Sequence, residues 1–145
     1  MDELPIDVIQ LDPDLDLPAY ARDGDAGLDL RARADAVIAA GGGRSLVPTG
    51  IAIALPLGYC GLIMPRSGLA LNHGITVLNA PGLIDAAYRG EIKVVLINTS
   101  DEDYAVSRGD RIAQLVVQRV ERVVWHSVDE LDGEHRGGGF GHTGR

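Results

Sequence analysis

The chain has 145 residues, a length that suits one domain with one hydrophobic core and disfavours a two-domain enzyme. Apolar residues make up 46% and charged residues 23%, close to the globular average, which excludes general disorder and fibrous repeats. The net charge of −8 disfavours a protein that tracks a nucleic-acid backbone.

Glycine and proline destabilise helix interiors. Because the chain has 19 glycines and 7 prolines, short strands and many turns are expected. Alternating and β-branched segments predict strands at residues 6–11, 26–31, 45–55, 59–64, 75–78, 91–98 and 111–125. One short helical turn is predicted at residues 69–72, and a β-hairpin at residues 81–91. Strands at this spacing favour a sandwich or jelly roll.

Compartment and domain organisation follow from three features. Cys60 is the only cysteine, which suits a reducing compartment, and the N-terminus lacks the pattern of a signal peptide. No apolar stretch approaches the length of a membrane span, so we expect a soluble, cytoplasmic protein without a membrane partner. Residues 128–145 turn acidic and then glycine-rich, and are expected to form a mobile arm beyond a β domain of residues 1–127.

Two short segments carry candidate chemistry. Arg66, Ser67 and Gly68 follow an apolar strand and open the helical turn, where a guanidinium, a hydroxyl and free N–H groups could seat a phosphate, although an N-cap serine is the simpler interpretation. Asp85 is the only acid between Asp35 and Glu91. It could equally be a turn aspartate bonded to its own backbone.

Other polar residues give weaker signals. Asp29 and Gln114 each lie among apolar strand residues. An inward carboxylate at Asp29 is costly unless it is paired or near a metal, whereas Gln114 could simply be an outward-facing polar residue of an alternating strand. The sequence at residues 139–144 matches G-x-G-x-x-G, but no helix or βαβ unit accompanies it. The four histidines have no metal-ligand spacing, so a tightly bound transition metal is not expected.

Five motifs in order resemble the homotrimeric dUTP diphosphatases, or dUTPases, across essentially the whole chain. They are A-G-x-D-L at 26–30, P-R-S-G-L-A at 65–70, N-x-P-G-x-I-D-x-x-Y-R-G-E at 79–91, R-G-D-R-I-A-Q-L at 108–115, and the glycine-rich R-G…G-F-G-x-T-G at 136–144. The resemblance implies a jelly-roll-like β fold and hydrolysis of dUTP to dUMP and diphosphate with Mg²⁺. This activity would limit uracil incorporation into DNA and supply dUMP for thymidylate synthesis.

The resemblance also implies roles for single residues. Asp85 matches the carboxylate that activates the attacking water, and Tyr88 matches the aromatic residue that packs against deoxyribose. Asn79 and the hairpin backbone, including Gly82 and Ile84, would bind the uracil edge. The remaining positions match phosphate-binding residues (Arg66, Ser67, Gly68, Gln114), the acid that holds hydrated magnesium (Asp29), and the arm that closes over the substrate (Arg136, Phe140, Gly141).

In this family each site is shared by three subunits, so a homotrimer is expected. Two positions depart from the family pattern. The arm is one residue shorter between Arg136 and Phe140, so that either the arm takes a tighter path or His135 shares the arginine's role. Asn72 stands where many relatives carry a basic residue.

Two alternatives belong to other functional classes. The related dCTP deaminases carry a glutamate ten residues after the hairpin aspartate, but Val95 occupies that position here and cannot shuttle protons. A non-catalytic nucleotide-binding protein on the same fold is the other alternative, and the intact Asp85, Tyr88 and Gln114 argue against it.

Overall fold

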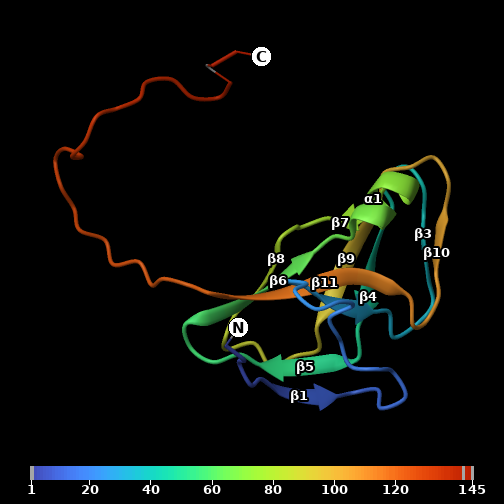
Figure 1. Ribbon diagram of the computed structural model, residues 1–145. Helices are drawn as coiled ribbons and strands as arrows, with labels where there is room; N and C mark the ends of the chain where they lie inside the picture. The colour runs from blue at the N-terminus through green and yellow to red at the C-terminus, as the bar shows by residue number, and fades with distance from the viewer. Residues whose placement is uncertain (1, 142, 145) are drawn as a thin grey trace.

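Short strands dominate the computed structural model, which describes residues 2–141 and 143–144 (Figure 1). The elements of the described residues are β1 (Asp7–Gln10), β2 (Leu28–Arg31), β3 (Ala36–Ile38), β4 (Arg44–Pro48), β5 (Ile51–Ala54), β6 (Tyr59–Met64), α1 (Ser67–His73), β7 (Ile75–Val77), β8 (Gly82–Ile84), β9 (Lys93–Asn98), β10 (Tyr104–Val106) and β11 (Arg111–Arg119). The predicted class, all-β with one short helix, is confirmed.

Non-local antiparallel pairing organises these strands. The largest sheet has the order β2-β11-β6-β8, a second has the order β4-β9-β7, and β1-β5 and β3-β10 form two-stranded ribbons. Neighbours in a sheet therefore come from distant parts of the chain, as in jelly-roll folds. The long strand β11 lies between β2 and β6, so it brings three separate segments of the sequence together.

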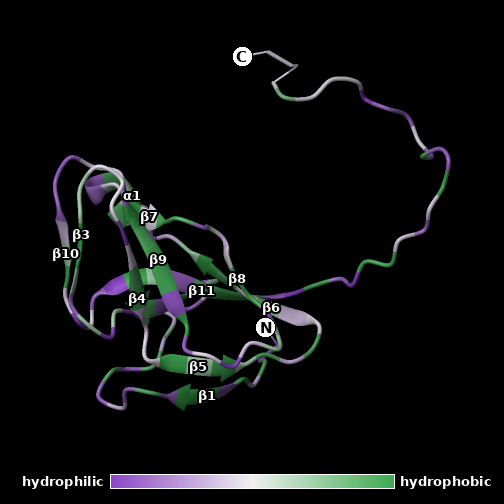
Figure 2. Cartoon of the chain, turned by 180° about the vertical axis from the view of Figure 1, so that it is seen from behind, coloured by the Kyte–Doolittle hydropathy of each residue, from purple (hydrophilic) through white to green (hydrophobic). Residues whose placement is uncertain are grey.

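The core is built from the inward-facing residues of the strands. Leu30, Ile38, Val47, Val94 and Leu96 have no exposed surface, and in β9 buried residues alternate with more exposed ones. This period of two is the one expected of a strand with a single buried face. Figure 2 shows the apolar residues concentrated along the strands of the body.

The helix α1 occupies the predicted place and ends at Gly74. This glycine has a left-handed φ of 64°, and its N–H donates to the Ala70 carbonyl at 3.1 Å. A Cβ at this position would lie 2.9 Å from Thr99 Oγ1. Both the conformation and the close approach therefore favour glycine as the residue that stops the helix.

Two predicted strands differ in extent from the observed ones. The segment 45–55 is divided into β4 and β5, because Gly50 adopts a φ of 77° and turns the chain. Strand β5 then pairs with β1, whereas β4 pairs with β9. The segment 111–125 forms a strand only as far as Arg119, since the extended residues after it have no partner strand among the described residues.

The predicted hairpin at residues 81–91 is wrong as a two-stranded ladder. Strand β8 pairs with β6, whereas β9 pairs with β4 and β7, so the two arms of the hairpin belong to different sheets. The connection between them, residues 85–92, carries Asp85 and Tyr88, and the name hairpin is kept for it. The prediction also missed β3 and β10, which have three residues each and pair only with one another.

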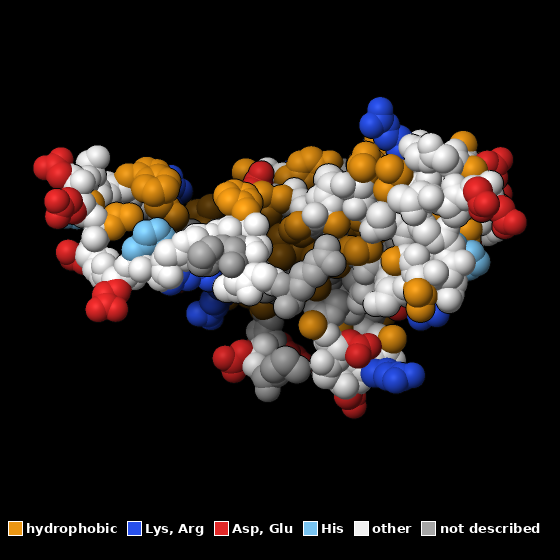
Figure 3. All heavy atoms as spheres, turned by 90° about the horizontal axis from the view of Figure 1, so that it is seen from above, with side chains coloured by type: hydrophobic (Ala, Val, Ile, Leu, Met, Phe, Trp, Pro, Cys, Tyr) orange, Lys and Arg blue, Asp and Glu red, His pale blue; other side chains and the backbone are white. Residues whose placement is uncertain are grey.

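After β11 the chain leaves the body. Val120 N donates to the Gly58 carbonyl at 2.9 Å, and the following residues arch away from the sheets (Figure 1). Large apolar side chains in this segment are exposed, among them Val124, Trp125 and Leu131. Seen from above, hydrophobic side chains lie on the surface of both the extended segment and the body (Figure 3).

Candidate active site

Three of the five motifs meet in one polar cleft of about 340 Å³, called here the arginine cleft. Its lining residues are Ala21, Arg22, Asp25, Gly27, Asp29, Arg66, Ser67, Gly68, Arg111 and Gln114. Strand register explains the meeting, because Gln114 of β11 lies opposite Asp29 of β2 on one side and opposite Met64 of β6 on the other. The structure thus brings together the predicted residues Asp29, Arg66, Ser67, Gly68 and Gln114.

Asp29 lies between two arginines in this cleft. Its Oδ1 is 3.8 Å from Arg66 Nε and its Oδ2 is 3.3 Å from Arg111 Nη1, with 17% of the side chain exposed. Arg66 Nη1 also donates to the Arg111 carbonyl at 3.0 Å. The Asp29 carboxylate is therefore paired with two guanidinium groups, which offsets the cost of its partial burial. The same contacts orient the side chains of Arg66 and Arg111.

Gln114 is held close to the first motif. Its Nε2 donates to the Pro65 carbonyl at 3.2 Å. A Cβ on Gly27 would lie 2.8 Å from Gln114 Oε1 and 3.1 Å from Gln114 Cβ, so a side chain at position 27 would displace the glutamine. The glycine of A-G-x-D-L therefore makes room for the glutamine of the fourth motif.

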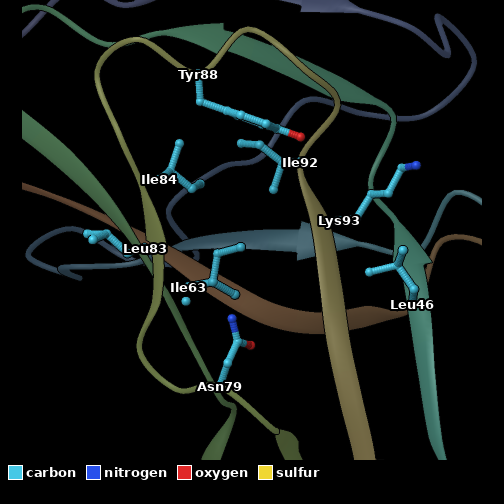
Figure 4. Close-up of a pocket in the computed structure, with 9 residues that line it drawn as sticks. Leu46, Ile63, Asn79, Leu83, Ile84, Tyr88, Ile92 and Lys93 are labelled. Atoms are coloured by element: carbon cyan, nitrogen blue, oxygen red, sulfur yellow. The ribbon is translucent and has the colours of Figure 1, made fainter.

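The third motif lies in a second opening of about 310 Å³, called here the hairpin cleft. Tyr88 stands at one end and Asn79 at the other, with apolar side chains from neighbouring strands between them (Figure 4). Its lining residues are Leu46, Ile63, Asn79, Gly82, Leu83, Ile84, Tyr88, Ile92 and Lys93. No residue lines both this cleft and the arginine cleft.

Asp85 lies directly after β8, exposed, and lines neither cleft within the chain. Its carbonyl accepts a hydrogen bond from Tyr88 N at 3.0 Å, which closes the turn. Tyr88 is 46% exposed, and its hydroxyl donates to the Glu91 carbonyl at 2.8 Å. The hairpin therefore presents a carboxylate and an aromatic ring at its outer end.

The residues predicted in the arm stand apart from both clefts. Arg136, Phe140 and Gly141 line neither of them, and Phe140 is fully exposed. The backbone of Phe140 adopts a positive φ of 49°. Within the isolated chain, the predicted site residues thus fall into the two clefts and the arm, with Asp85 outside all three.

Sequence reasoning missed three charged residues of the arginine cleft. Arg111 lies three positions before Gln114 in the fourth motif. Its place at the start of the same strand could have identified it as a residue of the site. Arg22 and Asp25 lie in a turn, where Asp25 Oδ2 accepts a hydrogen bond from Arg22 N at 2.9 Å, and only their charge distinguishes them from other turn residues. Lys93, at the edge of the hairpin cleft, was missed as well.

Two features are absent from the described residues. No group of three or more His, Cys, Asp or Glu side chains is arranged to hold a metal ion there. In the same part of the chain, no helix combines the length and apolar character needed to span a bilayer.

The chain is similar to known proteins over most of its length. The family model dUTPase matches residues 14–144. A deoxyuridine 5′-triphosphate nucleotidohydrolase of Thermobifida fusca is 60% identical over 141 residues, covering 96% of this chain and 78% of that protein. The corresponding protein of Corynebacterium glutamicum is 58% identical over 142 residues, covering 97% and 95%.

Solved structures agree on the fold. The dUTPase of Staphylococcus bacteriophage 80alpha with dUpNHpp superposes with a TM-score of 0.86 at 22% identity, covering 97% of this chain and 98% of that one. A dUTPase of phage phi11 of S. aureus, described as coordinating a structural Mg(II) ion, superposes with a TM-score of 0.80 at 22% identity, covering 90% and 100%. The jelly-roll expectation is thereby confirmed, and with a family model that spans nearly the whole chain and relatives of this identity, the chain belongs to the dUTPase family.

Proposed function

We propose that this protein hydrolyses dUTP to dUMP and diphosphate by attack of water on the α-phosphorus. The observation that carries the proposal is the arginine cleft, where strand pairing gathers residues of three dUTPase motifs around one polar opening. The relatives that share more than half of its sequence are named for the same reaction. The deaminase alternative is not favoured, because Val95 offers no group for proton transfer.

The hairpin cleft is proposed to bind the deoxyuridine part. Asn79 and the backbone of Gly82 and Ile84 supply fixed donors and acceptors for the uracil edge, while Tyr88 packs against the deoxyribose. A cytosine would leave buried polar groups unpaired, which costs more than a misplaced methyl group. This cleft therefore discriminates against cytosine more strongly than against thymine.

The arginine cleft is proposed to bind the phosphates. Arg66 offers a guanidinium fork, Ser67 and Gly68 lie at the start of α1, and Gln114 adds an amide. A Cβ on Gly68 would meet nothing within 4 Å, so there is open space beside this position. Cationic and amide donors fixed in advance stabilise the charge that develops on a leaving diphosphate.

Magnesium is the proposed cofactor, and the donor set fits it. Mg²⁺ prefers oxygen ligands, keeps several waters, and commonly binds one or two carboxylates together with substrate phosphates. The arginine cleft offers two carboxylates, Asp29 and Asp25, beside the proposed phosphate positions. When bound there with water between it and Asp29, the ion would neutralise phosphate charge.

Asp85 is the proposed general base. Its carboxylate accepts a proton from the water whose oxygen forms the new bond to the α-phosphorus, while the bond from that phosphorus to the bridging oxygen breaks and diphosphate leaves. The exposure of Asp85 at the end of β8 suits a base that meets substrate bound partly by another subunit.

A homotrimer with shared sites is the proposed assembly. In support, the residues proposed to bind one small substrate fall into two clefts without a common residue and a distant arm. One chain would supply the arginine cleft, a second the hairpin cleft, and a third the arm, where Phe140 stacks on uracil and Arg136 or His135 meets the terminal phosphate. In this proposal residues 1–127 form the catalytic β domain and residues 128–145 the arm.

A cytoplasmic location without membrane or nucleic-acid partners is proposed with this assembly. Cys60 is buried and unpaired, which suits a reducing compartment. The net charge of −8 suits a small-molecule enzyme rather than a protein that follows a phosphate backbone.

Product analysis after incubation with dUTP and Mg²⁺ tests the function. Equal amounts of dUMP and diphosphate, abolished by chelation of the metal, are expected. Release of ammonia would redirect the assignment to deamination, and tight dUTP binding without any product would indicate a non-catalytic nucleotide-binding protein.

A further inference from the structure

The Tyr88 ring is fixed by a contact with the end of its own motif. Its hydroxyl donates to the backbone carbonyl of Glu91 at 2.8 Å. Gly90 lies beneath it, and a Cβ there would be 2.6 Å from Tyr88 Oη and 2.8 Å from Cζ. The ring therefore lies against the backbone at residues 90–91, and its position depends on where that backbone is held.

The Glu91 side chain is itself held by groups from other segments of the chain. Its Oε2 accepts hydrogen bonds from Arg33 Nη1 at 3.0 Å and from Gly50 N at 3.0 Å. The Glu91 side chain is only 15% exposed and that of Arg33 is 35% exposed. A partly buried carboxylate with two donors is restrained far more than a surface ion pair.

Arg33 is fixed in turn by the segment before β2. Its Nη2 donates to the Leu11 carbonyl at 3.0 Å, and its Nε is 3.6 Å from Asp12 Oδ2. Asp12 also accepts two hydrogen bonds from Arg108, whose Nη1 donates to the Arg33 carbonyl at 2.8 Å. The Arg33 side chain is therefore restrained by contacts with Leu11 and Asp12 when it binds Glu91.

We propose that Arg33 and Glu91 are positioning residues that hold the Tyr88 ring in place and so set the discrimination between deoxyribose and ribose. This inference rests on the proposed function, in which Tyr88 packs against the sugar. A ring that cannot move leaves no space for a 2′-hydroxyl. When Glu91 loses its anchor, the backbone carbonyl and the ring shift together, and ribose is admitted.

The test measures kcat/KM for dUTP and for UTP in Glu91→Gln and Arg33→Gln. Glu91→Gln keeps the shape of the side chain, whereas Arg33→Gln shortens it and removes the guanidinium group, and both weaken the ion pair. We expect the dUTP/UTP ratio to fall by about tenfold, equivalent to about 1.4 kcal/mol, while kcat for dUTP changes little. Tyr88→Phe, which removes only the hydroxyl, should lower the ratio similarly and cause little further loss when combined with Glu91→Gln.

Arg31→Gln is the matched control. Arg31 lies two residues from Arg33 and donates to the Gly109 carbonyl at 2.9 Å, so its loss removes an arginine contact that does not involve Glu91. We expect Arg31→Gln to lower thermal stability about as much as Arg33→Gln without changing the ratio. If Arg33 had a merely structural role, Arg33→Gln and Arg31→Gln would lower thermal stability alike and would both leave the dUTP/UTP ratio unchanged.

Calorimetric binding of dUMP and UMP separates this inference from the proposed function, because it needs no turnover. A reduced preference for dUMP in Arg33→Gln and Glu91→Gln supports the positioning role even if the reaction differs from the one proposed. An unchanged preference in both folded variants would overturn it, whatever the preference of Tyr88→Phe.

Discussion

At the scale of single residues, the site depends on groups that restrain one another. Asp29 directs two arginines, Gly27 makes room for Gln114, and Glu91 supports Tyr88. Asp85 differs from these residues, because it is exposed and its carboxylate is not engaged by a cation within the described chain. A group left available in this way suits a base that acts only on bound substrate.

Substitution of Asp85 by Asn should leave folding, assembly and dUTP binding intact while lowering kcat by roughly 10²- to 10⁴-fold, the usual contribution of a positioned base. Steady-state kinetics and calorimetric dUTP binding measure the two effects. Asp101→Asn, another exposed acid in a turn, serves as the control and should keep normal activity. A near-normal kcat in Asp85→Asn would contradict the assignment.

A second residue-scale prediction concerns pH and stability. The hydrogen bonds from Arg108 lower the pKa of Asp12 below its usual 3.8, so Asp12 stabilises the folded state above that pH and loses this contribution as the pH falls through its folded-state pKa. Wild type should unfold at a higher temperature than Asp12→Asn near neutral pH, and the gap should narrow below pH 3.8. Thermal melts of both proteins over a pH series test this, and a constant gap would refute it.

At the scale of elements, local pattern predicts strands better than it predicts their partners. Alternation located β1, β6 and β9 closely, and His73 and Gly74 marked the end of α1. It could not reveal that β8 pairs with β6 rather than β9, because register depends on contacts distant in sequence. Strands of three residues, such as β3 and β10, carry too few residues for alternation to be seen.

The same limit applies to the candidate site. Motif order marked Asp29, Arg66 and Gln114, and the structure places them in one cleft. The contact of Asp29 with Arg111 joins residues 82 positions apart, and that of Arg33 with Glu91 joins residues 58 positions apart. Such pairs become visible only when the sheet order is known, which explains why sequence reasoning missed Arg111 and Arg33.

At the scale of the whole molecule, the C-terminal segment is exposed and lies away from the sheets. Five glycines between positions 137 and 144 make ordering the arm costly in entropy, so it should close only when Phe140 and Arg136 have a base and phosphates to hold. Removal of residues 135–145 should therefore leave the assembly and its melting temperature unchanged while most of kcat is lost. Retained turnover would mean that the arm is dispensable, and loss of assembly would mean that it is structural.

Subunit mixing tests the shared site directly. In the proposed trimer, one site combines the arginine cleft of one chain with the hairpin of another. Asp85→Asn damages only the hairpin part, and Arg66→Gln damages only the arginine cleft, so each variant alone should be nearly inactive. When the two are unfolded together and refolded, some sites join the intact cleft of the first variant to the intact hairpin of the second. Activity should therefore reappear in the mixture.

The control for this experiment mixes Asp85→Asn with Tyr88→Ala, both of which damage the hairpin. No combination of these chains contains an intact hairpin, so their mixture should not exceed the activity of the better single variant. If each chain instead carried a complete site, mixing Asp85→Asn with Arg66→Gln would restore nothing, because every chain would keep its own damaged residue. Recovery in the first mixture and not in the second is thus the pattern that only a site built between chains produces, and sedimentation of the refolded mixtures should give the mass of three chains.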